Sequence, residues 1–380
     1  MSAWFLRLLF IALTLIASAF STKLLLLVDM TFSAGLLLLP FLLILMALLQ
    51  LGHGIKFSMQ TILLAAIANL VFTGYGTIIT LMPSPDFAVN NILFDSILMQ
   101  PLHLILNNFL CFSLIPLVFL LFIFGLQTLT YLKPLKIHHE HNFLVRSKYL
   151  SMIMVLYGVI ILAANWYDPR FIKIFWFEVD SGTLVFPLTN IMLDIVTEVY
   201  GYKNARLAIW CGFLFNLIIL LMGQIVAHWH GPDLINFQAY QHFLLFDMRI
   251  IIASFVSYFA TEGISAYVLA KLKILLSGRL MALRFITSTM VGYLIDVVVF
   301  CVIAFVGLMS FKALLYIMLT SWLMMAGIEL ILLPLSVVIA KKLKQSEGID
   351  IFDQNTRFSL LSLDHEYTKA QNKFHDTAKN

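Results

Sequence analysis

The hydrophobic pattern of the chain is a series of long apolar runs separated by short polar connections. Because a spanning helix needs about 20 apolar residues, this pattern predicts about ten membrane-spanning helices. We expect four in the first half, near 3–21, 33–51, 58–82 and 104–131, and six in the second half, near 150–166, 183–200, 205–228, 248–271, 284–308 and 313–340.

The run at 183–200 differs from the others because polar residues recur along it. Asn190, Asp194 and Glu198 are spaced four apart, which places all three on one face of a helix. A carboxylate inside a bilayer segment is costly, so it usually faces a cavity or a partner and marks a substrate or ion path. The alternative is a buried polar stripe that holds two helices together.

Composition agrees with the pattern. The chain is 61% hydrophobic and 12% charged, with a mean hydropathy of +0.96, whereas soluble domains are about 45–50% apolar and about 25% charged. We therefore predict an all-α polytopic membrane protein in the lipid bilayer. The net charge of +4 is modest and lies at helix ends, which indicates orientation in a membrane rather than binding of nucleic acid.

The distribution of Lys and Arg predicts how the helices are oriented. Basic residues gather in the connections at 133–148, 203–206, 271–279 and 341–344, and they alternate with connections poor in Lys and Arg, such as 229–247. The positive-inside rule then places both termini in the cytoplasm. In the connection at 83–103, we expect Asp95 to need no partner.

Composition also divides the chain into four parts. Residues 1–132 form an N-terminal four-helix membrane region of unknown role, and 133–149 a basic cytoplasmic linker. Residues 150–344 form a six-helix module. The polar residues 345–380 have few apolar anchors, so we expect a disordered cytosolic tail.

Three ordered blocks in residues 146–345 carry a family resemblance. The first runs from Phe186-Pro-Leu through Asp194 and Glu198-Val-Tyr-Gly201 to Ala205-Arg206. The second is Phe246-Asp-Met-Arg249 with the residues that follow it, and the third is Arg284-Phe-Ile-Thr-Ser288-Thr289 with Gly292 and Asp296. This part of the chain resembles the queuosine precursor transporter family, also called the VUT family.

The resemblance implies a six-helix transporter that imports 7-deazapurine precursors of queuosine, such as preQ0 and preQ1, across the bacterial inner membrane. The four N-terminal helices depart from that pattern. The expected partners are the small-molecule substrate and the lipid bilayer, with protons as a candidate coupling ion and a homodimer left open.

The acids at membrane depth suit such a cargo. A 7-deazaguanine ring presents N1–H and an exocyclic amine as a paired donor edge, which a carboxylate accepts well. The candidate acids are Asp194, Glu198, Glu262, Asp296 and Glu329, and we prefer Asp194 and Asp296 for handling substrate or protons. Asn190, Thr289 and Tyr293 are the expected hydrogen-bond partners. Glu198 lies nearer the cytoplasmic mouth.

Two arginines are expected at helix ends. Arg249 and Arg284 stand at opposite ends of adjacent helices. Each either pairs with a carboxylate during transport or snorkels to the interface. Arg249 is the more suggestive, because it falls on the side that disfavours basic residues.

Other functions remain as alternatives. One is the substrate-binding membrane subunit of an ATPase-energised uptake system for a vitamin or heterocycle. Another is a structural or assembly protein. An intramembrane enzyme is disfavoured, because no nucleotide-binding, nucleophile or metal-ligand motif occurs in the sequence. We therefore expect neither enzymatic activity nor a cofactor or bound metal.

Overall fold

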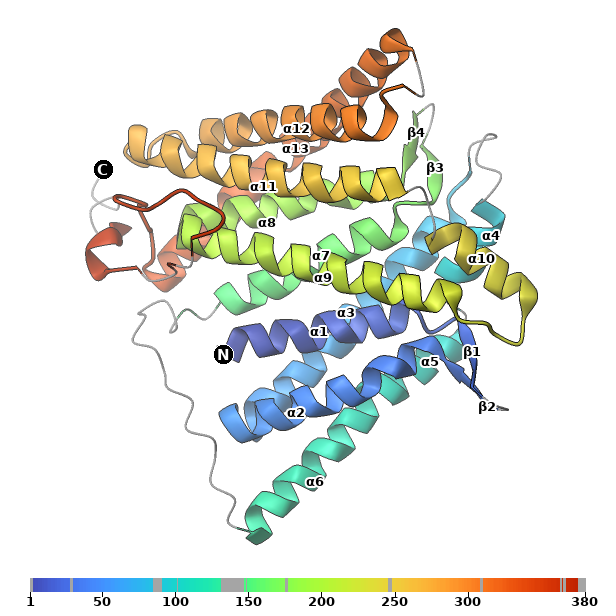
Figure 1. Cartoon of the computed structure of the whole chain (residues 1–380). Helices are drawn as coiled ribbons and strands as arrows, with labels where there is room; N and C mark the ends of the chain where they lie inside the picture. Colours follow the sequence, from blue (N-terminus) through green and yellow to red (C-terminus); the bar gives the residue numbers. More distant parts are fainter. Residues whose placement is uncertain are drawn as a thin grey trace. The chain divides into compact units, whose positions relative to one another are not determined.

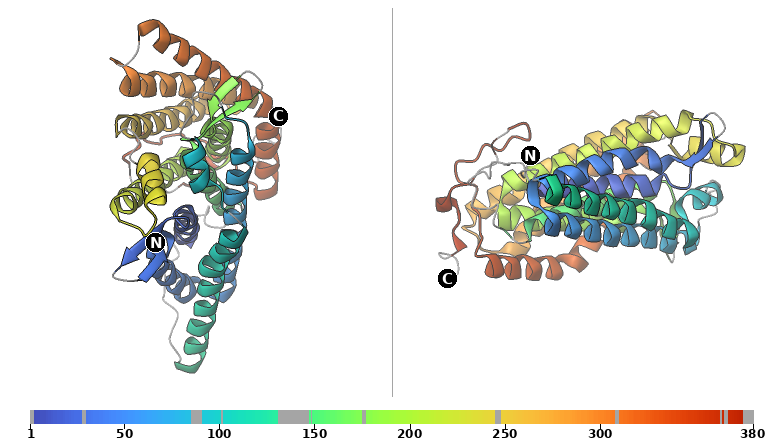
Figure 2. Two further views of the ribbon diagram at one scale, coloured as in Figure 1. Left: turned by 90° about the vertical axis from the view of Figure 1, so that its right-hand side faces the viewer. Right: turned by 90° about the horizontal axis from the view of Figure 1, so that it is seen from below.

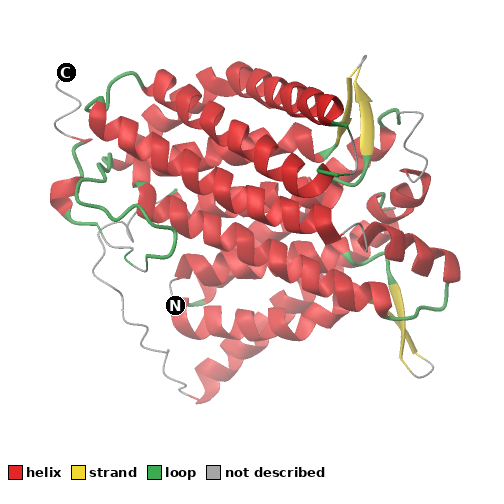
Figure 3. Cartoon of the chain, turned by 45° about the horizontal axis from the view of Figure 1, so that its top comes forward, coloured by secondary structure: helices red, strands yellow, loops and turns green. Residues whose placement is uncertain are grey.

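Helices make up most of the described residues in the computed structural model, which also contain two short strand pairs (Figure 3). The structure describes residues 3–27, 30–84, 91–100, 102–130, 147, 149–174, 177–244, 248–307, 310–362, 364 and 367–374. Most of the linker expected at 133–149 lies outside these residues, and so does the side chain of Arg249.

The elements follow one another in the order labelled in Figure 1. In the first half they are α1 (Ala3–Ala19), β1 (Leu24–Leu27), β2 (Met30–Ser33), η1 (Ala34–Leu38), α2 (Leu39–His53), α3 (Ile55–Leu81), α4 (Asn91–Leu98), α5 (Leu102–Phe109), the π-helix η2 (Leu110–Leu114) and α6 (Ile115–Thr130). In the second half they are α7 (Leu150–Tyr167), β3 (Phe171–Ile174), β4 (Phe177–Asp180), α8 (Gly182–Tyr200), α9 (Tyr202–His228), α10 (Leu234–Leu244), α11 (Met248–Leu275), α12 (Met281–Phe305), α13 (Phe311–Glu347) and η4 (Lys369–Gln371).

Within the described residues, nine helices are long and apolar enough to cross a membrane. Three of them lie before residue 130 and six after residue 149, at the positions expected from the apolar runs. The tenth expected span is α1, which has 17 residues and is shorter than the length a spanning helix usually needs. The prediction of an all-α polytopic membrane protein is confirmed.

The chain divides into two compact units that do not follow the sequence order. Unit 1 comprises residues 1–139, 158–185 and 215–245, and unit 2 comprises residues 140–157, 186–214 and 246–380. Helices α7, α8 and α9 therefore contribute residues to both units. The four-part division drawn from composition stays a prediction.

Unit 1 is built around α1, which is apolar except for Arg7, Thr14 and Ser18. Phe10, Ile11, Leu15 and Ile16 are at most 1% exposed, as expected for a helix that is surrounded by others. The polar end of α1 is held by Asn108, whose side-chain amide donates to Ser18 Oγ and Ser21 Oγ. The antiparallel pairs β1–β2 and β3–β4 also belong to this unit and are seen as arrows in Figure 2.

One expectation for unit 1 is wrong. Asp95 does have a partner, because its Oδ1 lies 2.6 Å from Nε of the buried Arg170. The same guanidinium donates to the carbonyls of Thr80 and Met82, each at 3.1 Å. Arg170 thus donates hydrogen bonds to carbonyls at the end of α3. Its buried charge needs a counter-charge, which the carboxylate of Asp95 on α4 supplies.

Unit 2 contains the polar helices. Residues 186–200 of α8 turn into α9 at Gly201, whose φ of +84° favours glycine. Further along, α11 packs on α12 and α12 on α13. Gly212 on α9 leaves space for the hydroxyl of Tyr258, which hydrogen-bonds to Tyr157 at 2.7 Å and donates to the carbonyl of Ile209 at 3.1 Å.

The expected disorder of residues 345–380 is wrong for the part that the structure describes. Helix α13 continues to Glu347, and the chain beyond it folds back onto unit 2. Ile349, Ile351, Phe352 and Tyr367 are at most 6% exposed. These few apolar anchors suffice because buried charges, described below, fix the segment between them. We name residues 348–374 the C-terminal segment.

Candidate functional site

The polar stripe of α8 is buried over its whole length. Thr189, Asn190, Asp194, Thr197 and Glu198 are each at most 2% exposed. The two threonine hydroxyls donate to carbonyls of their own helix, Phe186 and Leu193, at 2.7 Å. Each hydroxyl is therefore committed to the backbone, and the amide and the two carboxyls remain to face other helices.

Asp194 meets α12 through a threonine. Oγ1 of Thr289 donates to Oδ2 of Asp194 at 3.3 Å, and both residues are 1% exposed. This contact joins two residues that the sequence analysis placed together. Thr289 therefore contacts one of the two carboxyl oxygens of Asp194.

About two turns further along α12, Asp296 contacts α11. Oγ1 of Thr261 donates to Oδ1 of Asp296 at 3.3 Å, and Ser257 also faces this carboxyl. The two helices approach closely at Gly292, where an added Cβ would lie 3.2 Å from Cβ of Ser265. Small residues thus bring α11 near enough for its hydroxyls to reach the acid.

Tyr293 links α12 to α13. Its hydroxyl donates to Oε2 of Glu329 at 3.4 Å, and the side chain of Asn190 on α8 faces the same hydroxyl. Tyr293 is fully buried and Glu329 is 1% exposed. The aromatic ring therefore lies among polar groups from three helices.

A further buried acid, Glu262, lies on α11. It is fully buried, and it lies close enough to Asp296 and Glu329 to repel both electrostatically. Thr189 faces it, but that hydroxyl already donates to Phe186. Neither carboxyl oxygen of Glu262 accepts a hydrogen bond from the described residues. We name Asp194, Glu262, Asp296 and Glu329 the carboxylate cluster.

The carboxylate cluster has no basic counter-charge in the described part of the chain, where no Lys, Arg or His forms an ion pair with any of its four acids. Nor do three or more His, Cys, Asp or Glu side chains of the described residues form a group that could hold a metal ion. Four buried acids without cations are costly. The arrangement therefore suits a site that takes up protons or a polar, positively polarised ligand.

Glu198 has a different environment, one turn along α8 from Asp194. Arg284 donates to both of its carboxyl oxygens, and Lys344 lies 2.6 Å from Oε1. Lys344 and Lys273 also pair with Oδ1 of Asp350, at 2.7 and 2.6 Å. We name these five residues the ion-pair cluster. It joins α8, α11, α12 and α13 to the C-terminal segment.

The C-terminal segment also caps the start of α9. Oδ2 of Asp353 accepts the amide N–H of Tyr202 at 3.0 Å, and the hydroxyl of Tyr367 accepts the N–H of Lys203 at 2.8 Å. Tyr367 in turn donates to Oδ1 of Asp353 at 2.5 Å. Burial raises the pKa of Asp353, against the opposing effect of these hydrogen bonds. The first turn of α9 is thus capped by residues about 150 positions away.

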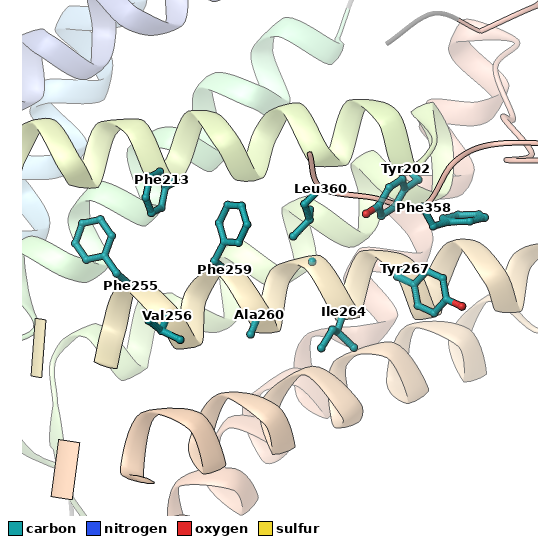
Figure 4. Close-up of a pocket in the computed structure, with 11 residues that line it drawn as sticks. Tyr202, Phe213, Phe255, Val256, Phe259, Ala260, Ile264, Tyr267, Phe358 and Leu360 are labelled. Atoms are coloured by element: carbon teal, nitrogen blue, oxygen red, sulfur yellow. The ribbon is translucent and has the colours of Figure 1, made fainter. Parts of the chain in front are cut away.

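A separate pocket of about 880 Å³ lies along α9 and α11 (Figure 4). Its lining is apolar and aromatic, with Phe213, Phe255, Phe259 and Tyr267 among its residues. Leu360 of the C-terminal segment closes part of it and fits where Gly263 has no side chain. The pocket contains none of the acids described above.

The structure thus brings together five of the seven candidate residues from the sequence analysis. Asn190, Asp194, Thr289, Tyr293 and Asp296 all lie in or beside the carboxylate cluster. Glu198 lies in the ion-pair cluster, where its carboxyl already has two contacts with Arg284 and one with Lys344. The side chain of Arg249 lies outside the described residues. Arg284 pairs with the carboxylate of Glu198, which agrees with the ion pairing expected for it and not with snorkelling to the interface.

Two acids that complete the cluster were noted in the sequence but not selected. Glu262 and Glu329 each interrupt an apolar run, the same signal that singled out Asp194. The face of the helix on which each one lies could not be read from the sequence, because the helices α11 and α13 carry weak polar periodicity.

Part of the chain that contains these residues is similar to a family of known proteins. Residues 180–339 match the family described as "Putative vitamin uptake transporter". The chain is 26% identical over 198 residues to the "Probable queuosine precursor transporter" of Bacillus subtilis (strain 168), which covers 51% of this chain and 86% of that protein.

A second relative agrees. The chain is 26% identical over 163 residues to the "Queuosine precursor transporter" of Escherichia coli (strain K12), covering 42% of this chain and 70% of that protein. No solved structure matches the chain. These matches confirm the family resemblance over residues 180–339.

Proposed function

We propose that the chain imports queuosine precursors, 7-deazapurines such as preQ0 and preQ1, across the bacterial inner membrane. It would act as a secondary transporter without enzymatic activity, with both termini in the cytoplasm. The observation that supports this most directly is the carboxylate cluster, which lies well inside membrane-spanning helices and has no basic partner among the described residues. The names of the two relatives support the choice of cargo.

The cluster offers what the ring of such a cargo requires. N1–H and the exocyclic amine of a 7-deazaguanine can donate together to one carboxylate, and Asp194 has one oxygen that Thr289 does not occupy. Nδ2 of the buried Asn190 has no acceptor among the described residues, so it can donate to the ring carbonyl. Tyr293 supplies an aromatic face, and stacking of a base on such a face contributes about 1–3 kcal/mol.

Protons are the proposed coupling ion. Four buried carboxyls without a cation among the described residues cannot all be ionised at low cost, so an empty site would hold protons. Asp194 on α8 and Asp296 on α12 are the proposed carriers, because both are buried acids without a basic partner among the described residues. Arg249 stays a predicted contributor at the far end of α11.

Complementation tests the proposal. The full-length chain is expressed in bacterial cells that can neither make nor import the precursor, and queuosine in tRNA is measured at limiting external precursor. We expect the wild type to restore queuosine and Asp194→Asn to reduce it by at least about tenfold, at equal membrane abundance. Restoration by the variant at the wild-type level would contradict the proposed site.

The same cells distinguish the alternatives. A substrate-binding subunit of an ATPase-energised system would restore queuosine only when its partner ATPase is present. The purified chain alone would then fail to transport in proteoliposomes. A structural protein would tolerate neutral residues at both Asp194 and Asp296.

A further inference from the structure

The apolar pocket along α9 and α11 lies on the side of these helices that faces lipid. Both helices are long and apolar enough to span a membrane. Val256 and Ile264, which line the pocket from α11, are 45% and 36% exposed. Exposed apolar side chains on a spanning helix face the hydrocarbon of the bilayer. The occupant nearest to hand is therefore a lipid.

Aromatic rings give the pocket a defined, elongated shape. Phe213 on α9 packs edge-to-face against Phe255 and Phe259 on α11, with ring centroids 5.3 and 5.5 Å apart. Figure 4 shows Phe213 and Phe255 at one end of the pocket and Tyr267 and Phe358 at the other. From Phe255 to Tyr267 the lining covers about 18 Å of helix, at about 1.5 Å per residue. This length is close to the hydrocarbon thickness of one leaflet, about 15 Å, so the pocket suits an acyl chain.

The C-terminal segment forms one wall of the pocket and is held there by α9. Nε1 of Trp210 donates to the carbonyl of Leu360 at 2.7 Å, and the guanidinium of Arg206 donates to the carbonyl of Ser359 at 3.0 Å. The side chain of Leu360 occupies the space that Gly263 leaves on α11. The pocket is therefore built by three parts of unit 2 and is more than a gap between two neighbouring helices.

A lysine stands at one end of the pocket without an acid. Lys271 follows Tyr267 by one turn of α11, and its Nζ lies 4.5 Å from the ring centroid of Phe358 and 5.9 Å from that of Tyr267. It is half-buried and forms no ion pair with an acid of the described residues. Asp364 of the C-terminal segment pairs instead with Lys203, at 2.6 Å. An ammonium group at the end of an apolar, lipid-facing pocket complements the phosphate of an anionic lipid.

We propose that this pocket binds one acyl chain of an anionic phospholipid, whose phosphate pairs with Lys271. The acyl chain lies along α11 towards Phe213 and Phe255, and the headgroup lies beside Tyr267 and Phe358. Burial of the chain supplies affinity for any phospholipid, whereas Lys271 supplies the preference for negative charge. This lipid is a ligand distinct from the cargo, so the proposal does not depend on the proposed function.

Lipid binding to the purified full-length chain tests the proposal. Delipidated protein in detergent is titrated with dioleoyl phosphatidylglycerol, which is anionic, or with dioleoyl phosphatidylcholine, which has no net charge, and bound lipid is counted by native mass spectrometry. We expect one molecule of the anionic lipid to bind at concentrations at least about fivefold lower. Glycerol phosphate, which carries the charge without acyl chains, should not displace it. Equal binding of the two lipids, or displacement by glycerol phosphate, would overturn the proposal.

Two variants separate the charge from the pocket. Lys271→Gln should bring binding of the anionic lipid to within about twofold of the other lipid. Lys342→Gln, at an exposed lysine near the end of α13, is the matched control and retains the preference. Ala260→Phe places a ring inside the pocket, so it should weaken binding of both lipids at least about fivefold.

Thermal unfolding establishes that each variant is folded before its lipid binding is compared. If Lys271→Gln keeps the wild-type preference, or if folded Ala260→Phe binds both lipids as the wild type does, the lipid is not bound in this pocket. Should Ala260→Phe fail to fold, the comparison of Lys271→Gln with Lys342→Gln decides alone, because both of these lysines lie at the ends of helices.

Discussion

Arg284 on α12 holds both carboxyl oxygens of Glu198 on α8, and both side chains are fully buried. Removing one partner of a buried pair costs about 3–5 kcal/mol when the other charge is left uncompensated, and Lys344 offsets part of that cost for Glu198. We therefore expect Glu198→Gln and Arg284→Met each to lower the thermal stability of the purified chain strongly. The double variant should lose much less than the sum of the two, because neither partner is then left alone. Additive losses in thermal unfolding would contradict a direct pair.

Asp353 should give the stability of the C-terminal segment a defined pH dependence. Burial raises its pKa, so the folded chain binds more protons than the unfolded chain between the ordinary pKa of Asp and the raised value. Stability then falls as pH rises through that window and is constant above it. Asp353→Asn cannot titrate. We expect the melting temperature of the wild type to fall between pH 4 and the raised value by more than that of Asp353→Asn; parallel curves would refute this role.

Asp350 ties the C-terminal segment to the helices, because Lys273 and Lys344 both pair with it. Asp350→Asn leaves two buried amines with reduced compensation, so the segment should open more readily. Limited proteolysis within 354–362 is expected to become at least about fivefold faster, since local opening governs such cleavage. Gln354→Ala, at an exposed position of the same segment, serves as the control. Unchanged cleavage of Asp350→Asn would show that apolar anchors alone hold the segment.

Gly292 allows α12 to pack close to α11. An added Cβ would lie 3.2 Å from Cβ of Ser265 and 3.6 Å from Cγ2 of Thr261. Gly292→Val should push the helices apart, lengthen the contact between Thr261 and Asp296, and lower the melting temperature. Gly327→Ala on α13 is the control, because nothing lies within 4 Å of its added Cβ, and alanine favours a helix. A fully stable, transport-competent Gly292→Val would mean that close packing here is dispensable.

The membrane architecture could be predicted from the sequence because each span needs only length and hydropathy. The same reasoning placed Asp194 and Asp296 at membrane depth, and the structure brings both into one cluster. Glu262 and Glu329 were harder to assign to the site, because the sequence of a long apolar helix does not reveal which face points inward.

Contacts that join distant parts of the chain could not be predicted. Composition indicated disorder after Lys344, yet Asp350 finds two buried lysines and Tyr367 reaches the start of α9. Similarly, Asp95 lies in a polar connection and still pairs with Arg170. Such pairs depend on the folded arrangement of helix ends, which composition does not encode.

Uptake of a labelled precursor by proteoliposomes that contain only the purified full-length chain tests the central proposal most directly. The comparison is between the wild type and the double variant Asp194→Asn with Asp296→Asn, at matched protein content and after thermal unfolding has shown that both are folded. We expect the wild type to take up 7-aminomethyl-7-deazaguanine and the folded double variant to take up at least about tenfold less. Equal uptake by the two proteins would show that the cargo does not cross at the carboxylate cluster.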